Sequence, residues 1–371
     1  MAFSKRSRPT FCMVCLFYVQ LLGHFCTVAG TGLPLSVPSQ RTLQQFSEVS
    51  IKAPGDIPCP YPGDIEPCIC TVNDDYSMDM DCSKIRSEED LQHAFSKKFP
   101  FYKFRKLIIE NNDNFRVLGE GALGNASFEE ININNCALNE IELHALHHSR
   151  GTLESLRLND NKLWSFPSFD LTQFPKLSYF SAQRNSFTVF PELVSYSLKT
   201  LFLDGNNFEH LLSESTTKGL PSLEIISLQN CSLTELSPES FSSNIHLSAV
   251  NLGFNSLTHL QYGTVNLSGP NSQLSLHSNK ITHLPKGSFS GVKMIMDVRD
   301  NFLEELEEAV WRPLLEDNVS LTLEGNPFVC GCDIAWLIVN QNLLDKVADR
   351  PTCHDGEAFI DLDPHIYEAL C

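Results

Sequence analysis

The chain has 371 residues and carries 45 acidic and 27 basic side chains, which gives a net charge of −18. An acidic surface of this kind repels nucleic acid and anionic membranes, so neither is expected as a partner. The length would ordinarily indicate two or three domains. Repeat proteins are the exception, because their core grows along one dimension, so internal repeats have to be sought first.

Residues 1–30 have the order of a secretory signal peptide. Lys5, Arg6 and Arg8 come first, then an apolar run from Phe11 to Leu22, then small residues up to Gly30. The apolar run is also compatible with an uncleaved anchor, but it is short for a bilayer. No later segment offers the ~18 uninterrupted apolar residues of a membrane span, so we expect a secreted, extracellular chain.

Two segments separate the signal peptide from the main body of the chain. Residues 31–58 are rich in proline and have little apolar periodicity, which predicts an unstructured leader. Residues 59–100 are predicted to form an N-terminal cysteine cap because they hold four cysteines, Cys59, Cys68, Cys70 and Cys82. Four cysteines allow three pairings, and their spacing alone does not select one.

Ten units with the frame apolar-x-apolar-x-x-Asn fill residues 101–326. We call the last position of the frame the anchor; the ten anchors are 21 to 25 residues apart and are Asn112, Cys136, Asn161, Asn185, Asn206, Cys231, Asn255, Asn279, Asn301 and Asn326. This period is the signature of leucine-rich repeats. We therefore predict an α/β leucine-rich-repeat solenoid, curved, with short parallel strands on its concave face and disulfide-bonded caps at both ends.

The anchor asparagines are expected to be structural. Each amide can donate to and accept from backbone groups that the bend after the strand leaves unpaired between neighbouring coils. Cys136 and Cys231 take this position in two units, four coils apart, which is about 19 Å at the ~4.8 Å spacing of strands and too far for a disulfide. We expect both to be free, buried thiols with no redox or metal role.

The outward strand positions should tile the concave face, and most of them are polar. The exception is a mid-stack patch of Arg157, Tyr179, Phe202 and Ile225. Aromatic and arginine side chains are the usual anchors of protein contacts, although single exposed hydrophobes are also normal on any surface. The patch is the predicted partner-binding site.

A second cysteine cluster predicts a C-terminal cap over residues 327–371, formed around Cys330, Cys332, Cys353 and Cys371. Zinc is the alternative for either cluster, because Cys-x-Cys also occurs in metal sites. Thiolate zinc sites, however, favour two to four residues between ligands and reducing compartments. Disulfides are therefore preferred at both ends.

Neither catalysis nor cofactor binding has a recognisable motif in this chain. There is no H-E-x-x-H, no phosphate-binding loop and no G-x-S-x-G, so no enzyme, cofactor or metal is predicted. His210, His259 and His283 share one repeat position, but a stable metal site needs three or four ligands. N-glycans are predicted at Asn125, Asn266 and Asn318; the sequon at Asn230 is doubtful because Cys231 beside it is expected to be buried.

Several segments beyond the generic repeat resemble one arthropod family, from about Cys59 to Cys371. They include Cys68–Val72, Glu308–Leu315, Cys330–Leu337 and the ending from Asp361–Pro364 to Glu368–Cys371. They are similar to the family of the non-catalytic subunit of Oplophorus-luciferin 2-monooxygenase. The likeness to extracellular repeat caps implies first-to-third and second-to-fourth pairing, which is Cys59 with Cys70, Cys68 with Cys82, Cys330 with Cys353, and Cys332 with Cys371.

The resemblance implies a secreted, non-catalytic subunit that stabilises or scaffolds another extracellular protein, such as a small catalytic subunit. It does not imply light emission. The alternative is an innate-recognition or extracellular-matrix protein that binds a microbial or matrix ligand. Recovery of one stoichiometric protein from the native fluid would favour the first hypothesis, and carbohydrate or microbial-surface binding the second.

Overall fold

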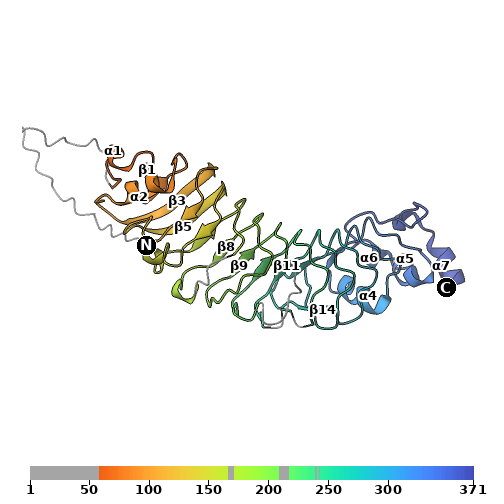
Figure 1. Ribbon diagram of the computed structural model, residues 1–371. Coiled ribbons are helices and arrows are strands. Elements are labelled where there is room, and N and C mark those ends of the chain that lie inside the picture. Colours follow the sequence, from red (N-terminus) through yellow and green to blue (C-terminus); the bar gives the residue numbers. More distant parts are fainter. Residues whose placement is uncertain (1–57, 166–170, 209–216, 239, 242) are drawn as a thin grey trace, which may run out of the picture. The chain divides into compact units, whose positions relative to one another are not determined.

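The structure is a computed structural model that describes residues 58–371 except 166–170, 209–216, 239 and 242 (Figure 1). The predicted signal peptide and all but the last residue of the predicted leader lie outside the described residues, as does His210. Among the helices of the described part, none is both long enough and apolar enough to cross a membrane.

The repeats form a parallel-strand solenoid. Its main sheet has twelve strands; two come from the N-terminal cap, β1 (Ile69–Val72) and β2 (Met78–Asp81), which pair antiparallel. The other ten run parallel in chain order: β3 (Lys103–Asn112), β5 (Ser127–Cys136), β7 (Ser155–Arg157), β8 (Tyr179–Ser181), β9 (Thr200–Phe202), β10 (Ile225–Ser227), β11 (Ala249–Asn251), β13 (Gln273–Ser275), β15 (Ile295–Asp297) and β16 (Ser320–Thr322). This confirms the predicted leucine-rich-repeat architecture.

The apolar positions of the frame build the core because strand side chains alternate between the two faces of the sheet. In the middle of the stack Leu201, Ile226 and Val250 pair in register and are all buried. Phe180 and Ala182, which replace the usual two aliphatics in the unit at Asn185, are buried as well. A large side chain beside a small one keeps the summed volume of that layer.

The anchor asparagines bridge neighbouring coils as predicted. The Asn255 amide donates to the Leu228 carbonyl at 2.8 Å, and its oxygen accepts from the backbone N–H groups of Cys231 at 2.9 Å and Leu233 at 3.0 Å. Asn279, Asn301 and Asn326 repeat this pattern one, two and three coils further on. The side chain thus satisfies backbone groups that no strand pairing reaches.

The two anchor cysteines keep half of this function. The Cys136 thiol donates to the Ile109 carbonyl at 3.4 Å and the Cys231 thiol to the Leu203 carbonyl at 3.3 Å. Both are free and buried, as predicted. Burial raises the pKa of Cys136 from 9.0 to about 11 and that of Cys231 to about 12, so both remain thiols at neutral pH.

The residue before every anchor has a left-handed backbone, a feature that the sequence analysis missed. These ten residues have φ between 50° and 75° and are Asn111, Asn135, Asp160, Arg184, Gly205, Asn230, Phe254, Ser278, Asp300 and Gly325. Asn, Asp and Gly tolerate this conformation, and seven of the ten are of these types. Phe254 is the bulky exception, and its ring stands edge-on to His277 with the centroids 4.8 Å apart.

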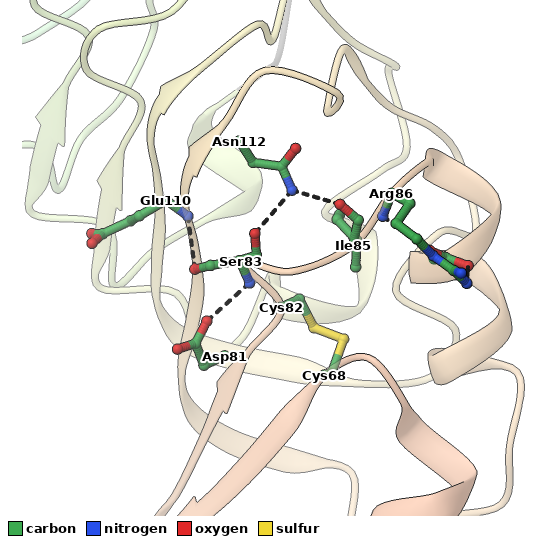
Figure 2. The surroundings of a disulfide bond; sticks show 9 residues. Cys68, Asp81, Cys82, Ser83, Ile85, Arg86, Glu110 and Asn112 are labelled. Atoms are coloured by element: carbon green, nitrogen blue, oxygen red, sulfur yellow. Dashed lines mark hydrogen bonds and ion pairs between the residues drawn. A yellow bond between two sulfur atoms is a disulfide. The ribbon is translucent and has the colours of Figure 1, made fainter.

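The N-terminal cap joins the first repeat through hydrogen bonds that lie beside one of the cap's own disulfides (Figure 2). Cys59 bonds to Cys70 and Cys68 to Cys82, the pairing that the resemblance implies. Next to the second disulfide, the Asn112 amide donates to the carbonyls of Ser83 at 3.0 Å and Ile85 at 2.8 Å. The first repeat thus contacts the cap in the same way that the anchor asparagine of a later coil contacts the coil before it. Its helices are α1 (Pro62–Ile65) and α2 (Glu88–Phe95).

The C-terminal cap closes the other end of the core. Its disulfides are Cys330–Cys353 and Cys332–Cys371, again the implied pairing. Leu337 and Ile338 of this cap are buried. The cap is built from η3 (Cys332–Ile334), α5 (Ala335–Ile338), α6 (Gln341–Leu344), η4 (Phe359–Asp361) and α7 (Pro364–Leu370), with α5, α6 and α7 at the blue end of the chain in Figure 1.

Where the structure describes them, the return segments of the coils hold short elements and one longer helix. They are β4 (Val117–Leu118) paired with β6 (Glu140–Ile141), β12 (Val265–Asn266) paired with β14 (Phe289–Ser290), η1 (His147–Ser149), η2 (Leu171–Gln173) and the longer α4 (Glu308–Glu316). α4 buries Val310, Trp311 and Leu315 against the last coils.

Asn255→Ala should destabilise the fold by about 3 kcal/mol, because it removes both the donor and the acceptor that satisfy buried backbone groups. Asn255→Cys is the matched variant, since a cysteine at this position donates to the preceding coil in two natural units. It should cost about half as much. Urea unfolding followed by circular dichroism measures both; equal losses would contradict the assigned bonds.

The two thiols should be unreactive in the native protein. At pH 8, iodoacetamide should label neither Cys136 nor Cys231, because burial raises both pKa values and blocks access. In urea without reductant, two equivalents should react. Mass spectrometry counts the labels, and rapid native labelling at either residue would show that the thiol is accessible.

Candidate functional site

The predicted binding patch lies on what we call the open face, the face of the main sheet opposite the core. It is formed by the strand residues six and four positions before each anchor, together with the residue two positions before it. The Arg157 guanidinium lies 4.4 Å above the centre of the Tyr179 ring, and the Tyr179 and Phe202 rings stand edge-on with centroids 5.6 Å apart. Arg157, Tyr179 and Phe202, which the sequence analysis grouped into one patch, therefore contact one another across three coils.

The register places the fourth patch residue beside this cluster. Tyr179 and Ile225 both pair with Thr200, one from each side, while Phe202 is two residues further along the same strand. All four patch residues are partly exposed. Arg157 also donates to the Ser155 hydroxyl at 2.8 Å and lies 3.9 Å from Glu130, so its guanidinium is held in place over the tyrosine.

A groove of about 530 Å³ begins at Phe202 and crosses the next four strands. Small side chains create it, because Ser227, Asn251 and Ser275 follow Phe202 in the same register column. Sequence reasoning found the aromatic patch but not the groove. The run of small residues directly after a phenylalanine in this column was the available signal.

The far end of the groove is charged. Asp297 accepts hydrogen bonds from the Arg299 side chain at 3.0 and 2.9 Å and from the Thr322 hydroxyl at 2.9 Å. Burial alone would raise the pKa of Asp297, but these bonds outweigh burial and leave the pKa below its usual range. The groove thus runs from an aromatic end to an ionised one.

Many of the other polar side chains on the open face already make hydrogen bonds within the protein. The Asn134, Asn159 and Asp204 side chains each accept from a backbone N–H in the following coil, at 3.0, 2.8 and 2.7 Å. Gln183 and Ser227 also donate to Asp204. Polar groups engaged in this way are less available to a partner, which makes the aromatic patch stand out further.

Within the described residues no group of three or more His, Cys, Asp or Glu side chains is placed to hold a metal ion. His259 and His283 are neighbours in adjacent coils, where their backbones form a parallel bridge, and both are exposed. They do not gather further ligands in this part of the chain.

All four sequon asparagines lie at the surface. Asn125, Asn266 and Asn318 are exposed, as their predicted role requires. Asn230 is exposed too, because its left-handed backbone turns the side chain outward while Cys231 points into the core. Burial therefore gives no reason to doubt this sequon, although its backbone is unusual.

Comparison with known proteins agrees with this architecture. A family model described as Leucine Rich Repeat matches residues 222–244. A chain of the solved octameric complex of Latrophilin 3 (Lec, Olf), Unc5D (Ig, Ig2, TSP1) and FLRT2 (LRR) has a TM-score of 0.51 and 21% identity, covering 70% of this chain and 89% of that chain. The protein is a leucine-rich-repeat protein with a disulfide-bonded cap at each end.

Sequence relatives narrow the class. The Oplophorus-luciferin 2-monooxygenase non-catalytic subunit of Oplophorus gracilirostris is 37% identical over 319 residues, which are 85% of this chain and 89% of that protein. The high affinity nerve growth factor receptor of Gallus gallus is 29% identical over 156 residues, only 14% of that receptor. The chain therefore belongs to the family of the Oplophorus-luciferin 2-monooxygenase non-catalytic subunit, and the resemblance seen in its sequence is confirmed.

The exposed sequons give a direct prediction. When the chain is expressed through the secretory pathway, it should carry N-glycans at Asn125, Asn266 and Asn318, because all three are accessible at the surface. Enzymatic deglycosylation followed by peptide mass spectrometry should convert each of these asparagines to aspartate. Unmodified peptides at all three would contradict the prediction, and the same measurement reports on Asn230.

Proposed function

We propose that this protein is a secreted, non-catalytic subunit that holds and stabilises another extracellular protein on its open face. The observation that carries the proposal is the contact cluster of Arg157, Tyr179 and Phe202 at the head of the groove. Tyrosine and arginine are enriched among the residues that dominate protein interfaces. A preformed, partly apolar cluster also has little side-chain entropy left to lose on binding.

Family membership supports the same function. The relative from Oplophorus gracilirostris is named as a non-catalytic subunit, which by its name works beside a catalytic chain. We infer that the partner here is likewise a separate protein and that this chain performs no chemistry itself. Four disulfides support an oxidising, extracellular setting, as does the predicted signal peptide.

The groove indicates how a partner would sit. An apolar side chain of the partner fits the aromatic end beside Phe202 and Ile225, and a polar or charged group fits the end at Asp297 and Arg299. The apolar contact supplies binding energy and the charged end fixes orientation, since charge complementarity mainly governs specificity and the rate of association.

The decisive experiment isolates the partner and then removes the patch. The tagged chain is first used to capture proteins from the native extracellular fluid. The affinity of the recovered partner is then measured for the native chain and for the Tyr179→Ala/Phe202→Ala double variant. We expect affinity to fall by at least about thirtyfold, since each side chain is a candidate hot spot. The isolated chain should show no turnover of any substrate of the recovered partner.

The matched control is Tyr196→Ala/Tyr262→Ala, which removes two exposed aromatic rings outside the open face. It should leave affinity within about twofold of the native value. Unchanged affinity in the patch variant would refute the placement of the site. Recovery of a carbohydrate or microbial-surface ligand instead of one stoichiometric protein would favour the innate-recognition alternative and overturn the proposed role as a subunit.

A further inference from the structure

A second cavity, of about 520 Å³, lies between the last return segments, α4 and the C-terminal cap. It shares no lining residue with the groove on the open face. Four carboxylates and two indoles define its chemistry: Glu305, Glu307, Glu308, Asp333, Trp311 and Trp336. Its volume falls in the range of ordinary ligand sites.

The two tryptophans differ in how their indole N–H groups are used. Trp336 donates to the Leu306 carbonyl at 3.1 Å. Trp311 lines the cavity with only 2% of its surface exposed, and its N–H has no acceptor among the described residues. The Trp311 nitrogen is not among the unpartnered polar atoms of the described residues that are sealed from solvent, so it keeps a small accessible surface. A buried tryptophan N–H normally has a partner, and because the Trp311 ring lines the cavity, its N–H can donate to a ligand bound there.

The carboxylates give the cavity an unbalanced negative charge. Glu308 is paired with Arg312, and Asp333 accepts from the Leu306 N–H at 3.2 Å. Glu305 and Glu307 have no ion pair within the described part of the chain, and no lysine or arginine lines the cavity. This excess of negative charge has the same sign as the net charge of −18 of the whole sequence. A cationic ligand is therefore favoured.

A metal ion does not fit this arrangement. The acidic side chains are not gathered into a group that could coordinate an ion, as the described residues contain no such group of three or more. An extended organic cation can instead reach separate carboxylates and lie against an indole face, where cations are attracted by the ring. A ligand that also offers a carbonyl oxygen would satisfy the Trp311 N–H.

We propose that this cavity binds a basic peptide segment of a partner protein. A lysine or arginine side chain lies beside Glu305 and Glu307, and a main-chain carbonyl of the segment accepts from the Trp311 indole. The site is separate from the proposed partner patch and would give the protein a second point of attachment. Two linked contacts bind far more tightly than either contact alone.

The test uses the full secreted chain and a fluorescein-labelled peptide of six arginines, with binding measured by fluorescence anisotropy in 150 mM salt. The variant is Glu305→Gln/Glu307→Gln, and the matched control is Glu192→Gln/Glu235→Gln, which removes the same charge from exposed positions elsewhere. We expect at least tenfold weaker binding for the variant and at most a twofold change for the control.

Trp311→Phe keeps an aromatic ring but removes the N–H, and it should weaken peptide binding severalfold with the far-ultraviolet circular dichroism retained. Equal losses in both glutamine pairs would mean general attraction to an acidic surface and would overturn the proposal, as would the absence of any binding to the native chain. Tyr179→Ala/Phe202→Ala should leave peptide binding unchanged, so failure of the cavity and failure of the patch are distinguishable.

Discussion

The bend that follows each strand is the constraint on which the rest of this structure depends. At every bend the chain turns through a left-handed residue and buries backbone groups that no neighbouring strand can reach. Asn255 shows the solution, because its amide N–H donates to a carbonyl of the preceding coil and its oxygen accepts from two backbone N–H groups of that same coil. Unpaired, each such group would cost about 1–3 kcal/mol, so a stack of ten coils cannot form without this column.

The same constraint shapes the open face. The strands are only three residues long through most of the stack, so the backbone N–H just beyond a strand needs a side-chain acceptor, and Asn134, Asn159 and Asp204 provide one. A face that looks polar in sequence is thus partly an internal scaffold. The residues that serve no backbone group, Tyr179 and Phe202 above all, are the ones free to be selected for a partner.

The frame and the cysteines were predictable from the sequence because each position repeats, and ten repetitions average out local exceptions. The anchors, the buried thiols of Cys136 and Cys231 and the patch members were all found in this way. The groove was not, since it arises from the absence of side-chain volume at Ser227 and Ser275 and not from any one residue. The cavity beside α4 could not be predicted for another reason. Its lining combines Glu305 of a repeat with Trp336 of the C-terminal cap, and no repeat pattern relates these two positions.

The one-dimensional build of the fold explains how two binding regions can coexist. Each coil packs mainly on its immediate neighbours, so a substitution in one coil disturbs those beside it and little else. The aromatic patch lies on β7 to β10, several coils from the second cavity next to the C-terminal cap, whereas the charged end of the groove at Asp297 lies in a coil that also lines that cavity. The cap disulfides hold the far end rigid without involving the patch. Substitutions in the aromatic patch can therefore alter its ligand while the second cavity keeps the ligand that it binds. In a protein with a single compact core, such independent changes would be rare.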